Sequence, residues 1–379
     1  MTRSLNMRSP KLRSAVLAAC AATLPLFAGC APGSGGGGGS GPTGLYIDQM
    51  PEITPVVTPD NDPIYWGAAP NIDPHYGGTL YAGTNKEIPD PRPPLDNDGN
   101  QRLRMWMADP NDGRTDRPAV IWIHGGGFAF GADAMHGLAV GVGADYAKRG
   151  YVGFSLEYRM NTTLVPSGNS SPALCQWVQD NENPNDPTWL AHFETCKNNV
   201  QAATRDALAA VRYLRANAAT YGIDPDRIAV AGFSAGAVTA MGTAYRSDDV
   251  GTVSYFTGDT PTSTNSKPQA VLAASGCLSP AYVDGSTPEI GAGDVPTSGI
   301  ASRFDQALDY SCAARTVQDA RAQSLVAELT SYCSTNLHAN TLYNANKSAT
   351  DYQWTTFLSR WLNLRNDVRD PSADGFCAN

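Results

Sequence analysis

Two glycine-rich motifs contain the residue types that acyl-transfer chemistry needs. The first is Gly232-Phe-Ser-Ala-Gly236, which follows the apolar run Ile228–Ala231 and precedes a stretch of small residues. A strand, a tight turn and a helix in this succession expose the hydroxyl of Ser234 at the carboxyl edge of a sheet. The flanking glycines are needed because a Cβ atom would clash in so tight a turn. The alternative is a serine that only caps the helix. The context favours a nucleophile.

The second motif, His124-Gly-Gly-Gly-Phe128, also ends an apolar run, at residues 119–124. Consecutive glycines let the backbone approach a substrate and direct N–H groups toward it. Acyl transfer passes through a negatively charged oxygen, and each preorganised donor there is worth about 3–4 kcal/mol. Alone, the motif could be a plain glycine-rich turn. Because it precedes the Ser234 motif by about 110 residues, it indicates an oxyanion hole.

Both motifs occur in a chain of alternating strand and helix patterns. Short apolar runs predict strands at 103–107, 119–124, 151–157, 227–231, 270–275, 298–302 and 328–332. Longer periodic segments predict helices at 137–149, 198–221, 234–246, 312–323 and 352–364. Residues 45–100 are rich in Pro, Asp and Asn and predict irregular structure with one or two edge strands. The alternation predicts an α/β fold with a mostly parallel sheet and helices on both faces.

From about residue 103 to 364 the chain resembles the lipase and carboxylesterase family that carries HGGG and GxSxG on the α/β-hydrolase fold. The resemblance is densest at residues 117–128, at Tyr158-Arg159 and at residues 206–236. It implies the α/β-hydrolase fold for residues 45–379. It also implies that the oxyanion hole consists of the backbone N–H groups of Gly126, Gly127 and Ala235. His124 would then be structural.

The fold's chain order of nucleophile, acid and histidine assigns the rest of a triad. His338 is the one histidine that follows Ser234, so it is expected to be the base. The acid should follow the strand after 270–275, where Asp294, Asp305 and Asp309 compete. The register of the resemblance favours Asp305, with Asp309 next. Substrate contacts are expected from residues beside the motifs and from one insertion: Phe128, Phe233 and Trp177.

The first 29 residues are typical of an export signal. Four basic residues and no acidic residue precede or enter the apolar stretch 15–29. This stretch ends in a sequence that resembles a bacterial lipobox at Cys30, although Phe27 stands where that box prefers leucine. Cys20 fits the box more closely but leaves almost no apolar stretch before it. We therefore predict a signal peptide at 1–29, a lipidated Cys30 and attachment to the bacterial cell envelope, with an ordinary secretory signal as the alternative.

Residues 30–44 are rich in Gly and Ser and are expected to form a flexible tether. Removal of residues 1–29 would take away four of the 27 basic residues and none of the 36 acidic ones, which leaves a net charge of −13. An exported protein with this charge is a poor candidate for binding nucleic acid. The expected partners are a small-molecule ester and, through the lipid anchor, a membrane.

Six cysteines remain beside Cys20 and Cys30, and an even number in an oxidising compartment predicts three disulfides. Their order along the chain suggests the pairs Cys175–Cys196, Cys277–Cys312 and Cys333–Cys377. No CxxC pair occurs, so no zinc site is expected.

The first pair bounds a long polar insertion at residues 161–197. It leaves a strand that we place beside the nucleophile's strand, so it should overhang the carboxyl edge of the sheet. Its apolar side chains could line the substrate site or could only pack the insertion onto the body: Leu174, Trp177, Trp189, Leu190 and Phe193.

Together these features predict a serine carboxylic-ester hydrolase that acts on short-chain or small soluble esters without a metal or organic cofactor. In this account His338 takes the proton of Ser234, and Asp305 orients His338. The alternatives are a lipase, a peptidase or an acyltransferase on the same fold, or a catalytically silent binding protein.

Overall fold

A computed structural model describes residues 45–68, 102–130, 134–160, 174–247, 265–279 and 290–364, and every structural statement below refers to them. The predicted signal peptide, Cys30 and the tether lie outside these residues. So do the first part of the insertion, 161–173, and Cys377. Among the described helices, none is long and apolar enough to span a bilayer.

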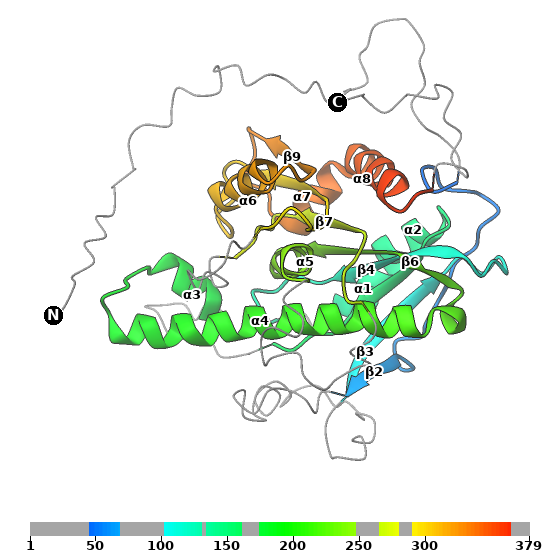
Figure 1. The fold of residues 1–379 in the computed structure, drawn as a ribbon, viewed down its shortest axis with the longest axis horizontal. Coiled ribbons are helices and arrows are strands. Elements are labelled where there is room, and N and C mark those ends of the chain that lie inside the picture. Colours follow the sequence, from blue (N-terminus) through cyan, green and yellow to red (C-terminus); the bar gives the residue numbers. More distant parts are fainter. Residues whose placement is uncertain are drawn as a thin grey trace, which may run out of the picture. The chain divides into compact units, whose positions relative to one another are not determined.

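One sheet organises the described part of the chain (Figure 1). Its strands are β1 (Val56–Val57), β2 (Ile64–Ala68), β3 (Arg102–Asp109), β4 (Arg117–Ile123), β5 (Val152–Leu156), β6 (Ile223–Phe233), β7 (Ala270–Ala274), β8 (Thr297–Ser302) and β9 (Ala327–Tyr332). The strand order is β1-β3-β5-β4-β6-β7-β8-β9, and β2 also pairs with β3. All pairs from β5 to β9 are parallel, and only those that involve β3 are antiparallel. The predicted mostly parallel sheet and edge strands are confirmed.

Both faces of the sheet are covered, which explains the unbroken apolar runs in the sequence. Every residue of β4 is buried. Successive side chains of a strand point to opposite faces, and those of β4 divide accordingly between two hydrophobic cores. Ile121 and Ile123 join one core, and Val120 and Trp122 join the other.

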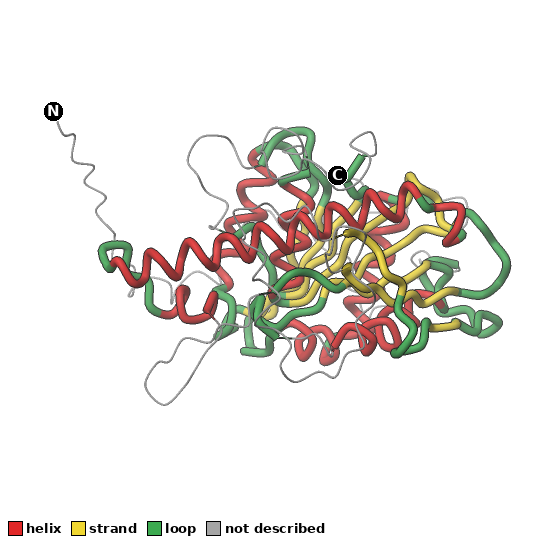
Figure 2. The backbone as a smooth tube through the Cα atoms, turned by 90° about the horizontal axis from the view of Figure 1, so that it is seen from below, coloured by secondary structure: helices red, strands yellow, loops and turns green. Residues whose placement is uncertain are grey.

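Helices form a layer on each face of the strands (Figure 2). The core that contains Ile121 is completed by α3 (Leu174–Asp180), α4 (Pro187–Ala216), α5 (Ala235–Tyr245) and α6 (Tyr310–Ala322). The opposite core is completed by α1 (Ala134–Leu138), a π-helical turn (Ala139–Gly143), α2 (Ala144–Ala147), α7 (Ala339–Ala345) and α8 (Lys347–Trp361). The predicted helices therefore exist, but the one at 137–149 is broken into three segments.

The insertion differs most from its prediction. Its second half is helical, because α3 occupies 174–180 and α4 begins at Pro187, well before the predicted start at 198. Asp186 caps α4 by accepting a hydrogen bond from the Thr188 N–H group at 2.8 Å, and proline suits the first helical turn. The strand that precedes the insertion was predicted to lie beside the nucleophile's strand. This placement is wrong, since β4 separates β5 from the nucleophile's strand β6.

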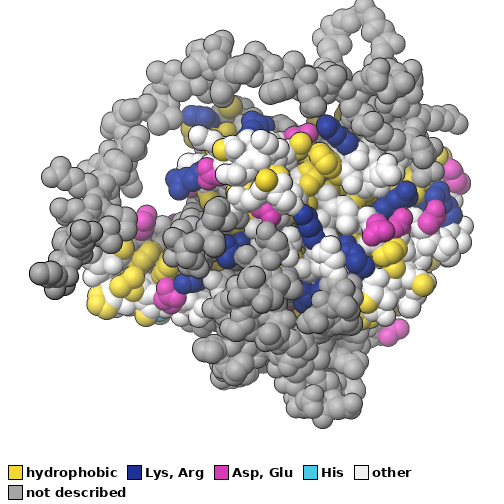
Figure 3. Space-filling model, viewed as in Figure 1, with side chains coloured by type: hydrophobic (Ala, Val, Ile, Leu, Met, Phe, Trp, Pro, Cys, Tyr) yellow, Lys and Arg dark blue, Asp and Glu magenta, His cyan; other side chains and the backbone are white. Residues whose placement is uncertain are grey.

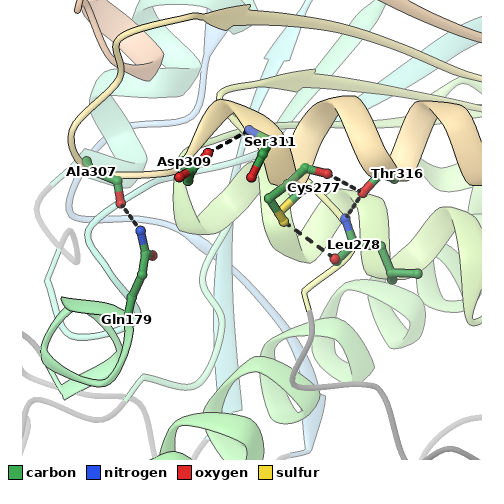
Figure 4. Close-up of a disulfide and its surroundings, with 8 residues drawn as sticks. Gln179, Cys277, Leu278, Ala307, Asp309, Ser311 and Thr316 are labelled. Atoms are coloured by element: carbon green, nitrogen blue, oxygen red, sulfur yellow. Dashed lines mark hydrogen bonds between the residues drawn. A yellow bond between two sulfur atoms is a disulfide. The ribbon is translucent and has the colours of Figure 1, made fainter. Parts of the chain in front are cut away.

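Two of the three predicted disulfides are formed. Cys175–Cys196 joins α3 to α4, and Cys277–Cys312 joins the segment after β7 to α6 (Figure 4). The third prediction, Cys333–Cys377, is wrong for Cys333, which is an exposed free thiol just after β9. That pair was predicted only because both cysteines were left over after the first two pairs.

The described surface is mixed in character. On the face shown in Figure 3, Lys and Arg side chains are interspersed with Asp and Glu side chains. The large hydrophobic side chains that are exposed come from different elements: Val56, Phe130, Val140, Leu190, Phe304 and Tyr352.

Candidate active site

Ser234 forms the turn between β6 and α5. Its backbone has φ 56° and ψ −122°, a conformation that non-glycine residues rarely adopt. The Ser234 N–H group donates to the Ala274 carbonyl at 3.0 Å, which fastens the turn to the neighbouring strand β7. This strained turn presents the serine side chain at the carboxyl edge of the sheet.

The flanking glycines are required by space. A Cβ atom on Gly232 would lie 2.1 Å from the carbonyl oxygen of Gly236, and one on Gly236 would lie 2.2 Å from that of Ile123. Both obstacles are backbone atoms, which cannot swing away as a flexible side chain can. The GxSxG spacing therefore reflects the close contact of the turn with its own helix and with β4.

Three side chains from distant parts of the sequence form a hydrogen-bonded chain. His338 Nε2 lies 2.7 Å from Ser234 Oγ, and His338 Nδ1 lies 2.7 Å from Asp305 Oδ2. A carboxylate accepts at Nδ1, so the ring proton belongs there and Nε2 is left to accept the serine proton. The Asp305 side chain is 2% exposed, whereas that of His338 is 27% exposed and open to solvent. This geometry suits transfer of a proton from serine to histidine.

The second oxygen of Asp305 is also occupied. Its Oδ1 accepts hydrogen bonds from the N–H groups of Ala307 at 2.9 Å and Leu308 at 3.1 Å. Burial by itself would raise the pKa of Asp305, but the hydrogen bond and charge of His338 and these two donors outweigh it. The pKa is held below its usual value, so the carboxylate stays ionised.

The competing acids have other roles. Asp309 caps α6 by accepting a hydrogen bond from the Ser311 N–H group at 2.7 Å (Figure 4). Asp294 accepts a hydrogen bond from the Gly291 N–H group at 2.7 Å. Of the three candidates, Asp305 is the one that hydrogen-bonds His338.

The HGGG loop lies directly against the nucleophile. A Cβ atom on Gly125 would lie 2.9 Å from the Cβ atom of Ser234. Gly126 and Gly127 have φ values of 117° and 60°, and the Gly126 carbonyl accepts hydrogen bonds from the N–H groups that follow at positions 129 and 130. The loop is thus folded back on itself beside Ser234. The Ala235 N–H belongs to the first turn of α5, where N–H groups have no partner within the helix.

His124 stabilises the backbone of this loop. Its Nδ1 lies 2.7 Å from the Gly125 carbonyl, and its ring stacks on Tyr158 with centroids 4.5 Å apart. The Tyr158 hydroxyl donates to the His124 carbonyl at 3.0 Å. Burial lowers the pKa of His124 to about 4, so the ring is neutral at physiological pH. His124 contacts none of the three hydrogen-bonded side chains in these interactions.

Comparison with known proteins places this chain near hydrolases and esterases. Residues 105–176 and 192–286 match the BD-FAE family. Phenmedipham hydrolase of Pseudarthrobacter oxydans is 30% identical over 162 residues, which are 42% of this chain and 25% of that protein. Gut esterase 1 of Caenorhabditis briggsae is 26% identical over 37% of this chain and 20% of that protein. The chain thus spans a quarter or less of the length of these relatives.

Solved structures match over a larger part of the chain. Apo Thermogutta terrifontis esterase 2 aligns with a TM-score of 0.50 and 18% identity, over 73% of this chain and 94% of that one. A truncated carbohydrate esterase from gut microbiota aligns with a TM-score of 0.50 and 18% identity, over 69% and 91%. The chain has the α/β-hydrolase fold. The turn at Ser234 occupies the strand–helix junction typical of the nucleophile in this fold.

Two of the predicted substrate contacts are wrong. Phe233 is 1% exposed, because its ring lies in the core between Trp122, on which it stacks at 6.0 Å, and Tyr343. Phe128 is 5% exposed and packs edge-on against Tyr158. Both residues adjoin the motifs in sequence, but their side chains point into the protein.

The apolar residues of the insertion serve several purposes. Trp189 stacks on Phe193 at 5.0 Å and donates from Nε1 to the Val178 carbonyl, so it packs α4 against α3. Leu190 is exposed to solvent. Trp177 is partly buried and packs edge-on against His192, and its contact with substrate stays a prediction. Much of this segment thus serves packing.

The insertion also contacts the loop of the acid. Gln179 of α3 donates to the carbonyl of Ala307 at 3.3 Å, and the N–H group of the same residue binds Asp305 (Figure 4).

Within the described ranges, no group of three or more His, Cys, Asp or Glu side chains could hold a metal ion.

Proposed function

We propose that this α/β-hydrolase is a serine carboxylesterase. The observation that carries the proposal is the hydrogen-bonded chain Ser234–His338–Asp305 at the strained turn beside the HGGG loop. Groups that served only stability would not need this combination of a strained serine backbone, an ionised carboxylate and a partly exposed imidazole in one hydrogen-bonded chain. The relatives named above as a hydrolase and an esterase support ester hydrolysis as the reaction.

The mechanism has two stages. His338 Nε2 takes the hydroxyl proton as Ser234 Oγ attacks the ester carbonyl, and Asp305 stabilises the imidazolium that forms. The N–H groups of Gly126, Gly127 and Ala235 are proposed to bind the oxyanion of the tetrahedral intermediate. His338 then gives its proton to the departing alcohol. In the second stage His338 takes a proton from water, which attacks the acyl-enzyme and releases the carboxylic acid product from Ser234.

We propose short-chain, water-soluble esters as substrates. The His338 imidazole is accessible to solvent, and the helical part of the insertion is fastened by the Cys175–Cys196 disulfide instead of being free to open. A site of this kind needs no oil surface to expose it. A lipase, a peptidase and an acyltransferase on the same triad are the competing functions, together with a silent binding protein.

An ester panel tests this proposal. We expect p-nitrophenyl acetate and butyrate to be hydrolysed faster than the palmitate, with no jump in rate when the palmitate is emulsified. Faster turnover of the palmitate, or activation on emulsification, would identify a lipase. No turnover of any ester by the folded protein would favour the binding protein.

We also propose that the protein is exported and anchored through lipidated Cys30. The basic and apolar pattern of residues 1–29 and the tether at 30–44 support this proposal. The native protein should sediment with membranes, and Cys30→Ser should release it into the soluble fraction. Mass spectrometry of the mature N-terminus provides the check, because an unmodified N-terminus at another residue would exclude lipidation at Cys30.

A further inference from the structure

Ser275 lies at the carboxyl end of β7, between the strand that leads to Ser234 and the strand that leads to Asp305. It is 2% exposed, so it cannot touch a substrate that arrives from solvent. Its backbone φ is 53°, a left-handed value that is strained for a non-glycine residue. A buried serine held in this conformation needs an explanation.

The hydrogen bonds of this strand end reach the turn of Ser234, the strand that leads to Asp305 and the residue after His338. The preceding carbonyl, of Ala274, accepts the Ser234 N–H group at 3.0 Å, and the Ser275 N–H group donates to Ile300 of β8 at 2.9 Å. The Ser275 hydroxyl oxygen accepts the Ala339 N–H group at 2.9 Å, and Ala339 directly follows His338. One strand end therefore joins the nucleophile's turn, the strand before the acid and the backbone beside the base.

The residue that Ser275 binds is itself strained. Ala339 has a φ of 43°, and Ser234 has a φ of 56°. The N–H group of His338 is held separately by Thr341 Oγ1 at 3.2 Å. The backbone on each side of the imidazole is thus fixed by a different hydroxyl, one from its own helix and one, Ser275, from the central sheet.

We infer that Ser275 is a positioning residue, which holds the backbone of His338 where its ring can bridge Ser234 and Asp305. The inference rests on the proposed esterase function. Without the hydroxyl, the segment after His338 loses this hydrogen bond to the sheet. An imidazole displaced by a fraction of an ångström then binds either the serine or the carboxylate less well. A larger displacement, of about 1 Å, can cost about a hundredfold in rate.

Ser275→Ala and Ser275→Gly test this role. Both remove the hydroxyl, and Ser275→Gly also relieves the backbone strain. We expect each variant to lower kcat about tenfold to a hundredfold and to leave KM unchanged. Ser155→Ala is the matched control: Ser155 is a buried serine of β5 whose hydroxyl has no hydrogen-bond partner among the described residues. It should keep the wild-type kcat.

A proton NMR measurement gives a readout that needs no substrate. The His338 Nδ1–H proton, bonded to Asp305, should resonate far downfield and disappear in His338→Ala. In Ser275→Ala this signal should shift or broaden, while in Ser155→Ala it should not. Wild-type kcat and an unchanged signal in folded Ser275→Ala would overturn the inference even if the esterase function stands. A wild-type protein without esterase activity would refute the proposed function, while the NMR signal would still test Ser275.

Discussion

Ser234→Ala is expected to reduce ester hydrolysis by about six orders of magnitude in kcat, as when the nucleophile of another Ser-His-Asp enzyme is removed. The change deletes the atom that would bond to the acyl carbon and leaves His338 without its proton donor. The oxyanion N–H groups remain, so a rate of about 10³- to 10⁴-fold over water should persist. Initial rates with p-nitrophenyl butyrate measure both quantities.

Folding must be kept separate from chemistry in this variant. Alanine tolerates the strained φ no better than serine does, so Ser234→Ala should unfold at nearly the wild-type temperature. Circular dichroism and thermal unfolding of the same preparation check this. Ser155→Ala serves again as the control, since it removes a buried hydroxyl of β5, which β4 separates from the nucleophile's strand. Near wild-type turnover by folded Ser234→Ala would end the serine-esterase proposal.

Asp305→Asn is expected to lower kcat by about 10⁴-fold, as the same change does in a serine protease. The carboxylate now accepts the Nδ1 proton at 2.7 Å, but an amide can present its NH₂ group instead. His338 would then carry its proton on Nε2, the nitrogen that must accept from Ser234. Rates under saturating ester, compared with the wild type, measure the loss.

Two nearby aspartates make sharp controls for this variant. Asp309→Asn should change little, because asparagine caps a helix about as well as aspartate. Asp294→Asn should likewise leave kcat near the wild-type value, since that side chain binds the Gly291 N–H group. If Asp309→Asn alone were crippling and Asp305→Asn harmless, the proposed acid would be misassigned by one helical turn.

Local patterns were sufficient to predict much of the fold. The apolar run of β4 is buried on both faces, and the glycines at 232 and 236 are forced by backbone contacts, so each sequence signal had one structural cause. The start of helix α4 was predicted too late, because the prediction relied on composition. The polar character of the insertion put the predicted start of the helix at 198, although Asp186-Pro187 is a helix-start signal.

Contacts between distant segments could not be predicted. The direction of the Phe233 side chain depends on which face of β6 meets Trp122, and sequence adjacency to Ser234 suggested the opposite. The place of β5 depends on the order of strands in the sheet, which no local pattern encodes. No local sequence pattern indicates a role for Ser275, because its partner, Ala339, is 64 residues away. These features arise from tertiary packing.

The most direct test of the central claim is to trap the covalent intermediate. The protein would be incubated with a p-nitrophenyl alkylphosphonate, which transfers its phosphonyl group to an activated serine and releases p-nitrophenol. Digestion and mass spectrometry then locate the added mass. We expect one phosphonyl group on the peptide that contains Ser234, a matching loss of esterase activity, and no labelling of Ser234→Ala. Full loss of activity with the label on another residue, or ester turnover that the reagent leaves untouched, would contradict the account.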